Sequence, residues 1–202
     1  PILQTDVFPR RGGRLLVTCG PMFAGKTTRL QQTFRMLQQA KQPVTLMTHA
    51  SDTRFSEEAS IITHDRVALE DNVFPLKQLS AWSKQVDNTA PRHIIIDEVQ
   101  FFEDAVDAIC GMMEAGHTVH AFGLDMDFRG RGFGVMGELL AMADTVAKCT
   151  SLCECGALAT HTKRMNSNIK QVVAVGASES YAPCCFACFT AHQKSLAADA
   201  PK

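Results

Sequence analysis

The chain has 202 residues, 46% of them hydrophobic, which is enough for one large globular domain with or without a small appendage. Its formal net charge of -1 gives no general attraction for nucleic acid or anionic lipid and favours a small-molecule ligand. No apolar run reaches the roughly 20 residues that span a bilayer, and residues 1–9 lack the apolar stretch of a signal peptide. We therefore expect a cytoplasmic protein that binds neither membrane nor nucleic acid.

Short β-branched runs alternate with longer amphipathic stretches through the first half of the chain. This alternation predicts an α/β fold with a mostly parallel sheet. The expected strands are 15–19, 44–48, 93–97 and 119–124, and the expected helices are 28–42, 102–115 and 137–145.

The composition changes after residue 148, where Cys, Ser, Thr and Ala become frequent and a short strand is expected at 171–175. We predict a nucleotide-binding domain at 1–148, a small domain at 149–194 and a flexible tail at 195–202.

A glycine-rich segment lies between the first expected strand and the first expected helix. It reads GPMFAGKT and fits the pattern GxxxxGK followed by Ser or Thr, the P-loop that binds ATP phosphates with backbone N–H groups. Lys26 would reach the outer phosphates, and the Thr27 hydroxyl would ligate Mg²⁺. The alternative is a glycine-rich turn with a surface lysine. The candidate phosphate-binding residues are Gly20, Pro21, Met22, Phe23, Ala24, Gly25, Lys26, Thr27 and Thr28.

Two carboxylates follow the apolar run at 93–96. Asp97 would hold Mg²⁺ through water, as the acidic residue of a P-loop site does. Because side chains alternate along a strand, Glu98 should point to a different side and could accept the proton of an alcohol. The alternative for Glu98 is a carboxylate that complements the N-terminus of the following helix.

Four motifs in register resemble the type II thymidine kinase family over residues 13–190: GPMFAGKT, DEVQFF at 97–102, GLDMDFRGRGFG at 123–134 and TKR at 162–164. The resemblance implies a RecA-like P-loop domain followed by a small zinc-binding domain with a lasso-like segment that closes over the nucleoside. It implies ATP-dependent phosphorylation of the 5′-hydroxyl of thymidine in deoxynucleotide salvage, with Glu98 as the general base. Deoxyuridine or other deoxynucleosides are alternative substrates, because one methyl group in an apolar pocket discriminates only weakly. It also implies a homotetramer and feedback inhibition by thymidine triphosphate.

The resemblance further assigns residues to the nucleoside. Asp52 and Arg54 would form a charged pair near the phosphoryl-transfer region, with Arg54 on the phosphate side. Backbone hydrogen bonds would hold the thymine base, and apolar side chains would pack on its ring. Without the resemblance, the aromatic residues are equally consistent with core packing. The implied substrate-binding residues are Met22, Asp52, Phe101, Leu124, Phe128, Phe133, Thr162, Val172, Ala174, Gly176 and Tyr181.

Most of the eight cysteines lie within residues 149–188, which favours a metal over a disulfide framework. A CxxC pair matches the second half of the family's structural zinc site, whereas the first half is a CxC. The predicted zinc ligands are Cys153, Cys155, Cys185 and Cys188. The alternatives are Cys149 or Cys184 as a replacement ligand, and free thiols or a cystine without metal.

Two other functions fit parts of the sequence. A P-loop ATPase that acts on nucleic acid would need a basic groove, which the nearly neutral composition does not indicate. A zinc-ribbon interaction module fused to an inactive nucleotide-binding domain is disfavoured because Lys26, Thr27, Asp97 and Glu98 are all present.

Overall fold

The computed structural model describes residues 12–50, 73–84, 90–165 and 180–198. A six-stranded parallel sheet, in the order β3-β2-β4-β5-β1-β6, forms its centre. Because the strands are parallel, the residues that follow β1, β4 and β5 emerge at one edge of the sheet. The strands are β1 (Arg14–Cys19), β2 (Val44–His49), β3 (Val73–Leu76), β4 (His93–Ile96), β5 (Thr118–Gly123) and β6 (Thr145–Lys148).

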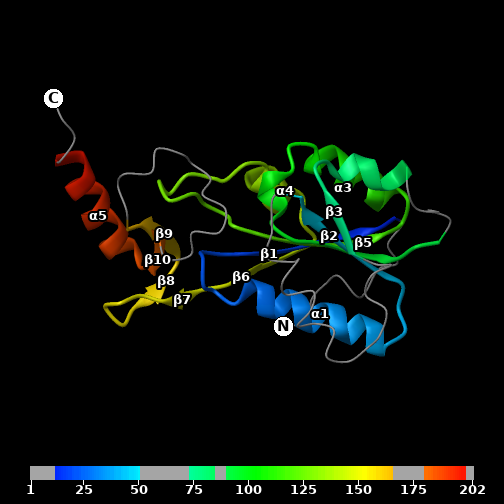
Figure 1. Cartoon of the computed structure of the whole chain (residues 1–202), viewed down its shortest axis with the longest axis horizontal. Coiled ribbons are helices and arrows are strands. Elements are labelled where there is room, and N and C mark those ends of the chain that lie inside the picture. The colour runs from blue at the N-terminus through cyan, green and yellow to red at the C-terminus, as the bar shows by residue number, and fades with distance from the viewer. Residues whose placement is uncertain (1–11, 51–72, 85–89, 166–179, 199–202) are drawn as a thin grey trace.

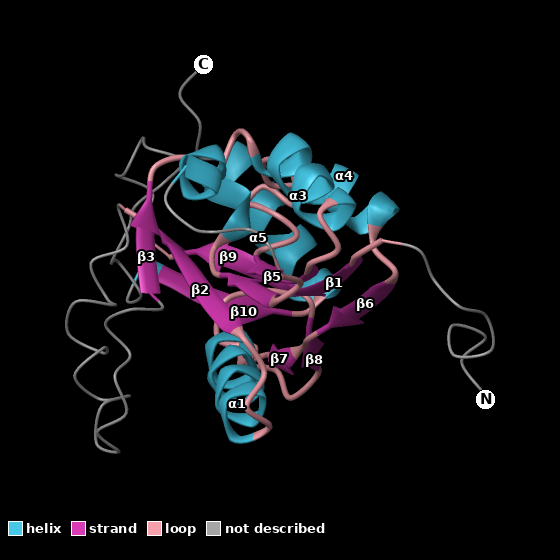
Figure 2. Ribbon diagram, turned by 90° about the vertical axis from the view of Figure 1, so that its right-hand side faces the viewer, coloured by secondary structure: helices cyan, strands magenta, loops and turns pink. Residues whose placement is uncertain are grey.

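Helices cover both faces of the sheet, with α1 (Lys26–Gln39) on one side and α3 (Ala105–Glu114) and α4 (Met136–Met142) on the other (Figure 2). Alternation along β4 divides the core. Ile95 packs in a cluster with Leu30 and Phe34 of α1, whereas Ile94 and Ile96 belong to a larger cluster on the opposite face. The larger cluster also includes buried residues of the 3₁₀ helix η2 (Leu79–Lys84).

A second unit lies at one end of the molecule and contains two small antiparallel sheets and a helix (Figure 1). Its buried core is small and consists of Cys153, Ala159, Cys184 and Phe189. The elements are β7 (Ser151–Leu152), β8 (Leu158–Ala159), β9 (His161–Arg164), β10 (Tyr181–Cys184) and α5 (Phe186–Ala198).

The parallel sheet and its four predicted strands are confirmed to within two residues at each end. The helix expected at 137–145 ends earlier, because β6 begins at Thr145. Strand β3 and helix α5 were not predicted, and α5 runs past residue 195, where a tail was expected. The strand expected at 171–175 lies outside the described residues. Within the described ranges, no helix is long and apolar enough to cross a membrane.

Candidate active site

The P-loop connects β1 to α1 and has left-handed backbone at Phe23 and Gly25. At Gly20 a Cβ atom would lie 2.3 Å from the carbonyl oxygen of Cys149, so this position has no room for a side chain. The ammonium group of Lys26 donates hydrogen bonds to the carbonyls of Gly20 (3.1 Å) and Pro21 (2.7 Å). The loop is therefore folded over its own lysine.

Three carboxylates influence the charge of this lysine. Burial lowers the pKa of Lys26, while the charges of Glu98, Asp97 and Asp125 act in the opposite direction and raise it. Because these charges act on one ammonium group, the residues that follow β1, β4 and β5 share one electrostatic environment. The sequence predicted this meeting for the P-loop, Asp97 and Glu98, but gave no role to Asp125.

Asp97 and Glu98 lie in a tight turn that follows β4. Asp97 is buried, and its Oδ1 accepts the backbone N–H of Glu98 at 2.9 Å. The strand ends at Ile96, and Glu98 has left-handed backbone (φ 49°, ψ 43°). The turn, rather than continued strand alternation, therefore sets the direction of Glu98. A non-glycine residue in this conformation costs of the order of 1–3 kcal/mol, and such strain occurs often at functional sites.

Asp125 and Lys148 form an ion pair beside the P-loop, with Nζ 2.8 Å from Oδ2. Asp125 is buried, and the hydrogen bond raises the pKa of Lys148. This pair connects the end of β6 to the segment that follows β5. Sequence reasoning missed it, since neither residue carries a spacing signal toward the other.

The aromatic residues assigned to thymidine make two groups of contacts. Phe101 and Phe133 form an edge-to-face pair with centroids 5.6 Å apart. The guanidinium of Arg164 lies 3.9 Å from the ring centroid of Phe128, and its Nη2 donates to the Tyr181 hydroxyl at 2.9 Å. Arg164 is a site residue that sequence reasoning missed, although it ends the TKR motif.

The remaining predicted residues make two hydrogen bonds. The backbone N–H of Met22 donates to the Thr162 hydroxyl at 3.1 Å and so connects the P-loop to the C-terminal unit. Leu124, which follows β5, donates its N–H to the side chain of Gln100 at 3.1 Å. Five predicted site residues lie outside the described part of the chain: Asp52, Arg54, Val172, Ala174 and Gly176.

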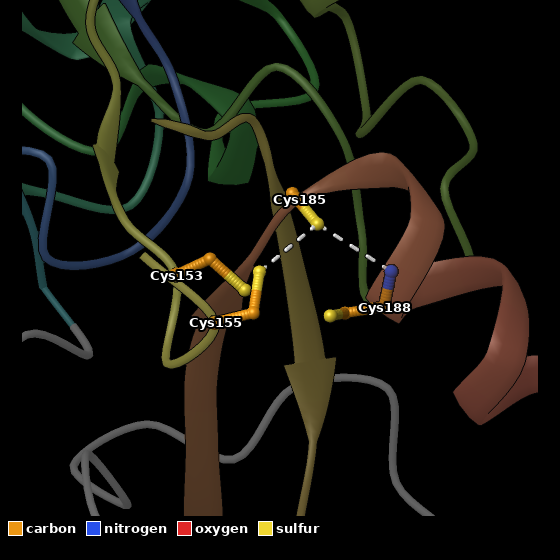
Figure 3. Close-up of side chains that lie close together, drawn as sticks. All are labelled: Cys153, Cys155, Cys185 and Cys188. Carbon is orange, nitrogen blue, oxygen red and sulfur yellow. Dashed lines mark hydrogen bonds between the residues drawn. The ribbon is translucent and has the colours of Figure 1, made fainter. Parts of the chain in front are cut away.

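The four predicted zinc ligands lie together, at the β7–β8 turn and the start of α5 (Figure 3). Their sulfur atoms all lie within 4.8 Å of one another, and the Sγ atoms of Cys155 and Cys185 are 3.7 Å apart. A tetrahedral site with Zn–S bonds of about 2.3 Å places its sulfur atoms about 3.8 Å apart. Hydrogen bonds from backbone N–H groups of Cys155 and Cys185 lower the pKa of the Cys153 thiol to about 6. The cluster could therefore hold a zinc ion.

A tight turn explains how the irregular CxC fits. The N–H of Gly156 donates to the carbonyl of Cys153 at 2.8 Å, and Gly156 has φ of 85°. This turn brings Cys153 and Cys155 to the same side of the hairpin. Cys149 and Cys184, the two alternative ligands, are not in the cluster. Cys184 is fully buried in the small core. The Sγ atom of Cys149 accepts a hydrogen bond from Nη1 of Arg29 at 3.8 Å. None of the eight cysteines forms a disulfide.

Comparison with known proteins adds independent findings. The family model described as "Thymidine kinase" matches residues 13–189. A "Thymidine kinase" of Bacteroides thetaiotaomicron is 37% identical over 89% of this chain and 88% of its own. Another from Bacteroides fragilis is 35% identical over 96% of this chain and 94% of its own. The human protein named "Thymidine kinase, cytosolic" is 36% identical over 88% of this chain and 73% of its own.

Proposed function

The chain belongs to the thymidine kinase family, and we propose that it transfers the γ-phosphoryl group of ATP to the 5′-hydroxyl of thymidine. The observation that supports this most directly is the meeting of a P-loop lysine with Asp97 and Glu98 in one electrostatic environment. We further propose that deoxyuridine is accepted, because one methyl group in an apolar pocket discriminates by only about 1–3 kcal/mol.

In the proposed reaction, the backbone N–H groups of residues 23–28, which include the N-terminus of α1, bind the phosphates. Lys26 leaves the carbonyls of Gly20 and Pro21 and moves onto the phosphate oxygens, where its charge stabilises the transition state. The hydroxyl of Thr27 and the carboxylate of Asp97 are oxygen donors that suit Mg²⁺, which when bound would neutralise phosphate charge.

Glu98 accepts the proton of the 5′-hydroxyl as its oxygen attacks the γ-phosphorus, and ADP leaves. We propose that Met22, Phe101, Leu124, Phe128, Phe133, Thr162 and Tyr181 hold the nucleoside. Two contacts support this assignment, the Phe101–Phe133 ring pair and the Arg164 contact with both Phe128 and Tyr181. The family resemblance adds Asp52, Arg54, Val172, Ala174 and Gly176, which lie outside the described residues.

We propose that the four clustered cysteines hold a structural zinc ion. Four thiolate ligands would complete the tetrahedron and leave no open position for catalysis. Zinc bound at the turn between β7 and β8 and at the start of α5 would join two segments about 30 residues apart.

The test of the proposed reaction is a transfer assay with γ-labelled ATP and four acceptors: thymidine, deoxyuridine, deoxycytidine and single-stranded DNA. We expect label on thymidine and deoxyuridine. Glu98→Gln should lower kcat by roughly 10²–10⁴-fold while ATP binding persists, because the shape remains and the base is lost. Near-normal turnover of this variant would remove Glu98 from the proposed role.

The alternative of an ATPase that acts on nucleic acid is not favoured by the family match or by the names of the relatives. In the transfer assay it would appear as free phosphate released faster with DNA and no labelled nucleoside.

The remaining proposals rest on the family resemblance. They are a homotetramer, inhibition by thymidine triphosphate, a cytoplasmic location and a division into domains at residue 148. Light scattering of the purified protein tests the first, and inhibition kinetics against both substrates test the second.

A further inference from the structure

A buried glutamine lies directly beside the proposed base. Gln100 belongs to the short 3₁₀ helix η3 (Val99–Phe101) and is only 5% exposed. Its Nε2 donates to Oε2 of Glu98 at 2.6 Å, and its Oε1 accepts the N–H of Leu124 at 3.1 Å. Both ends of the amide are therefore used, one by the proposed base and the other by the backbone that follows β5.

The chemistry of the two partners determines which way the amide points. An ionised carboxylate only accepts hydrogen bonds, and a backbone N–H only donates them. The Nε2 of Gln100 must therefore face Glu98 and its Oε1 must face Leu124. The reversed amide would place two acceptors together at one end and two donors at the other.

Two glycines are required by the close packing around this glutamine. A Cβ atom on Gly123 would lie 2.3 Å from Oε1 of Gln100, and one on Gly134 would lie 2.4 Å from its backbone oxygen. Gly134 also has φ of 52°, a conformation that L-residues rarely adopt. Gln100 is thus enclosed by both ends of the segment 123–134, which carries three of the proposed nucleoside contacts, Leu124, Phe128 and Phe133.

From these contacts we propose that Gln100 is a positioning residue for Glu98, which connects the base to the segment 123–134 that binds the nucleoside. The proposal rests on the proposed function, in which Glu98 is the base. A charge-assisted hydrogen bond of 2.6 Å holds the carboxylate of a residue whose backbone is already in an uncommon conformation. The same side chain accepts a hydrogen bond from the N–H of Leu124, so a movement of the segment 123–134 would also move the carboxylate of Glu98.

Two substitutions separate the two hydrogen bonds. Gln100→Glu keeps the shape and the acceptor for Leu124 but exchanges the donor that faces Glu98 for a second acidic group, which competes with Glu98 for a proton. Gln100→Met removes both interactions at similar size. Each variant is made alone and with Glu98→Gln, and kcat and KM are measured for thymidine and for ATP. Gln32→Glu on the exposed surface of α1 makes the same chemical change away from the site and is the matched control.

We expect Gln100→Glu to lower kcat about 10- to 100-fold with the KM for ATP unchanged, because Glu98 loses a hydrogen-bond donor and gains an acidic neighbour. In the Glu98→Gln background the same substitution should cause less than about a twofold further loss, because two residues that act as a unit are not additive. Gln32→Glu should leave all constants unchanged. Thermal unfolding of each variant measures the structural effect separately, and Gln100→Glu carries the test if Gln100→Met does not fold.

Two results would overturn the proposal: an unchanged kcat in Gln100→Glu, or an equal fold loss with and without Glu98. Failure of the proposed function looks different. If Glu98 were not the base, Glu98→Gln alone would be nearly as active as the unsubstituted protein, and if the protein were not a nucleoside kinase, the unsubstituted protein would label no nucleoside.

Discussion

The parallel sheet and the C-terminal unit differ in the size of their buried apolar cores. The sheet is covered by helices on both faces and buries two apolar clusters, with Ile94, Ile95 and Ile96 all fully inaccessible to solvent. In the described part of the C-terminal unit, the apolar core has only four buried residues, and two of these are cysteines. A core of this size does not balance the entropy of ordering a separate unit. The comparison indicates that the sheet is held by apolar burial, and it supports the proposal that a metal at the cysteine cluster stabilises the C-terminal unit.

Removal of one cluster cysteine should separate the two regions most clearly. We expect Cys185→Ser to lose zinc and unfold the C-terminal unit, because structural zinc contributes about 10–16 kcal/mol of apparent binding free energy. The sheet should remain folded. Metal content is measured by atomic emission, and limited proteolysis with mass spectrometry locates new cleavage sites, which we expect at 149–198.

Cys110→Ser is the matched control, since Cys110 lies on α3 and outside the cluster. It should retain the full metal content. A Cys185→Ser protein with a protease-resistant C-terminal unit would show that this unit does not depend on the cluster.

The extent of apolar burial also explains which elements the sequence could predict. Strands β1, β2, β4 and β5 are rich in apolar residues, and their pattern predicted them. Strand β6 was missed because it is largely exposed, and β3 because it has four residues and includes a proline. Helix α5 was missed because it follows the cysteine-rich segment and its own residues show no single apolar face.

An alanine substitution in the central sheet tests the other side of the comparison. Ile95→Ala should lower the free energy of unfolding by about 2–5 kcal/mol, because it leaves a cavity between β4 and α1. Zinc content should be unchanged. Chemical denaturation followed by circular dichroism measures the effect. Val146→Ala on the exposed strand β6 is the control and should change stability by less than about 0.5 kcal/mol. Loss of zinc from Ile95→Ala would indicate that the two regions unfold together.

A third substitution addresses the contact between the two regions at the proposed nucleoside site. Arg164→Met removes a charged hydrogen bond to Tyr181, which contributes about 1.5–3 kcal/mol, and a stacking contact with Phe128. We expect the KM for thymidine to rise about 10- to 100-fold with little change in the KM for ATP.

Arg129→Met is a suitable control, because Arg129 also approaches Phe128, but at 5.2 Å and from an exposed position. Its effect should be less than about threefold. Equal losses in the two variants would show that the charge near Phe128 matters and that the connection to Tyr181 does not.

Sequence motifs predicted the chemical groups of the site better than the contacts that hold them. Lys26, Asp97 and Glu98 follow from a P-loop and an acidic strand end, since phosphate chemistry restricts the residue types. The roles of Gln100, Arg164 and Asp125 did not follow, although all three lie in or beside the quoted motifs. Each is a buried polar residue with at least one partner 17 or more residues away, and no spacing rule predicts such a pair.

The smallest expected effect concerns the single hydrogen bond between Thr162 and the P-loop. Thr162→Val keeps the side-chain shape but leaves the N–H of Met22 without this acceptor, which should cost about 0.5–1.5 kcal/mol. Because Met22 belongs to the phosphate loop and both residues are proposed to hold the nucleoside, we expect the KM values for ATP and for thymidine each to rise about two- to tenfold. Ser151→Ala removes a hydrogen bond to the carbonyl of Phe23, in the same loop but exposed, and should change the KM less. If Thr162→Val altered only the KM for thymidine, this contact would serve the nucleoside site, and the phosphate loop would be independent of the C-terminal unit.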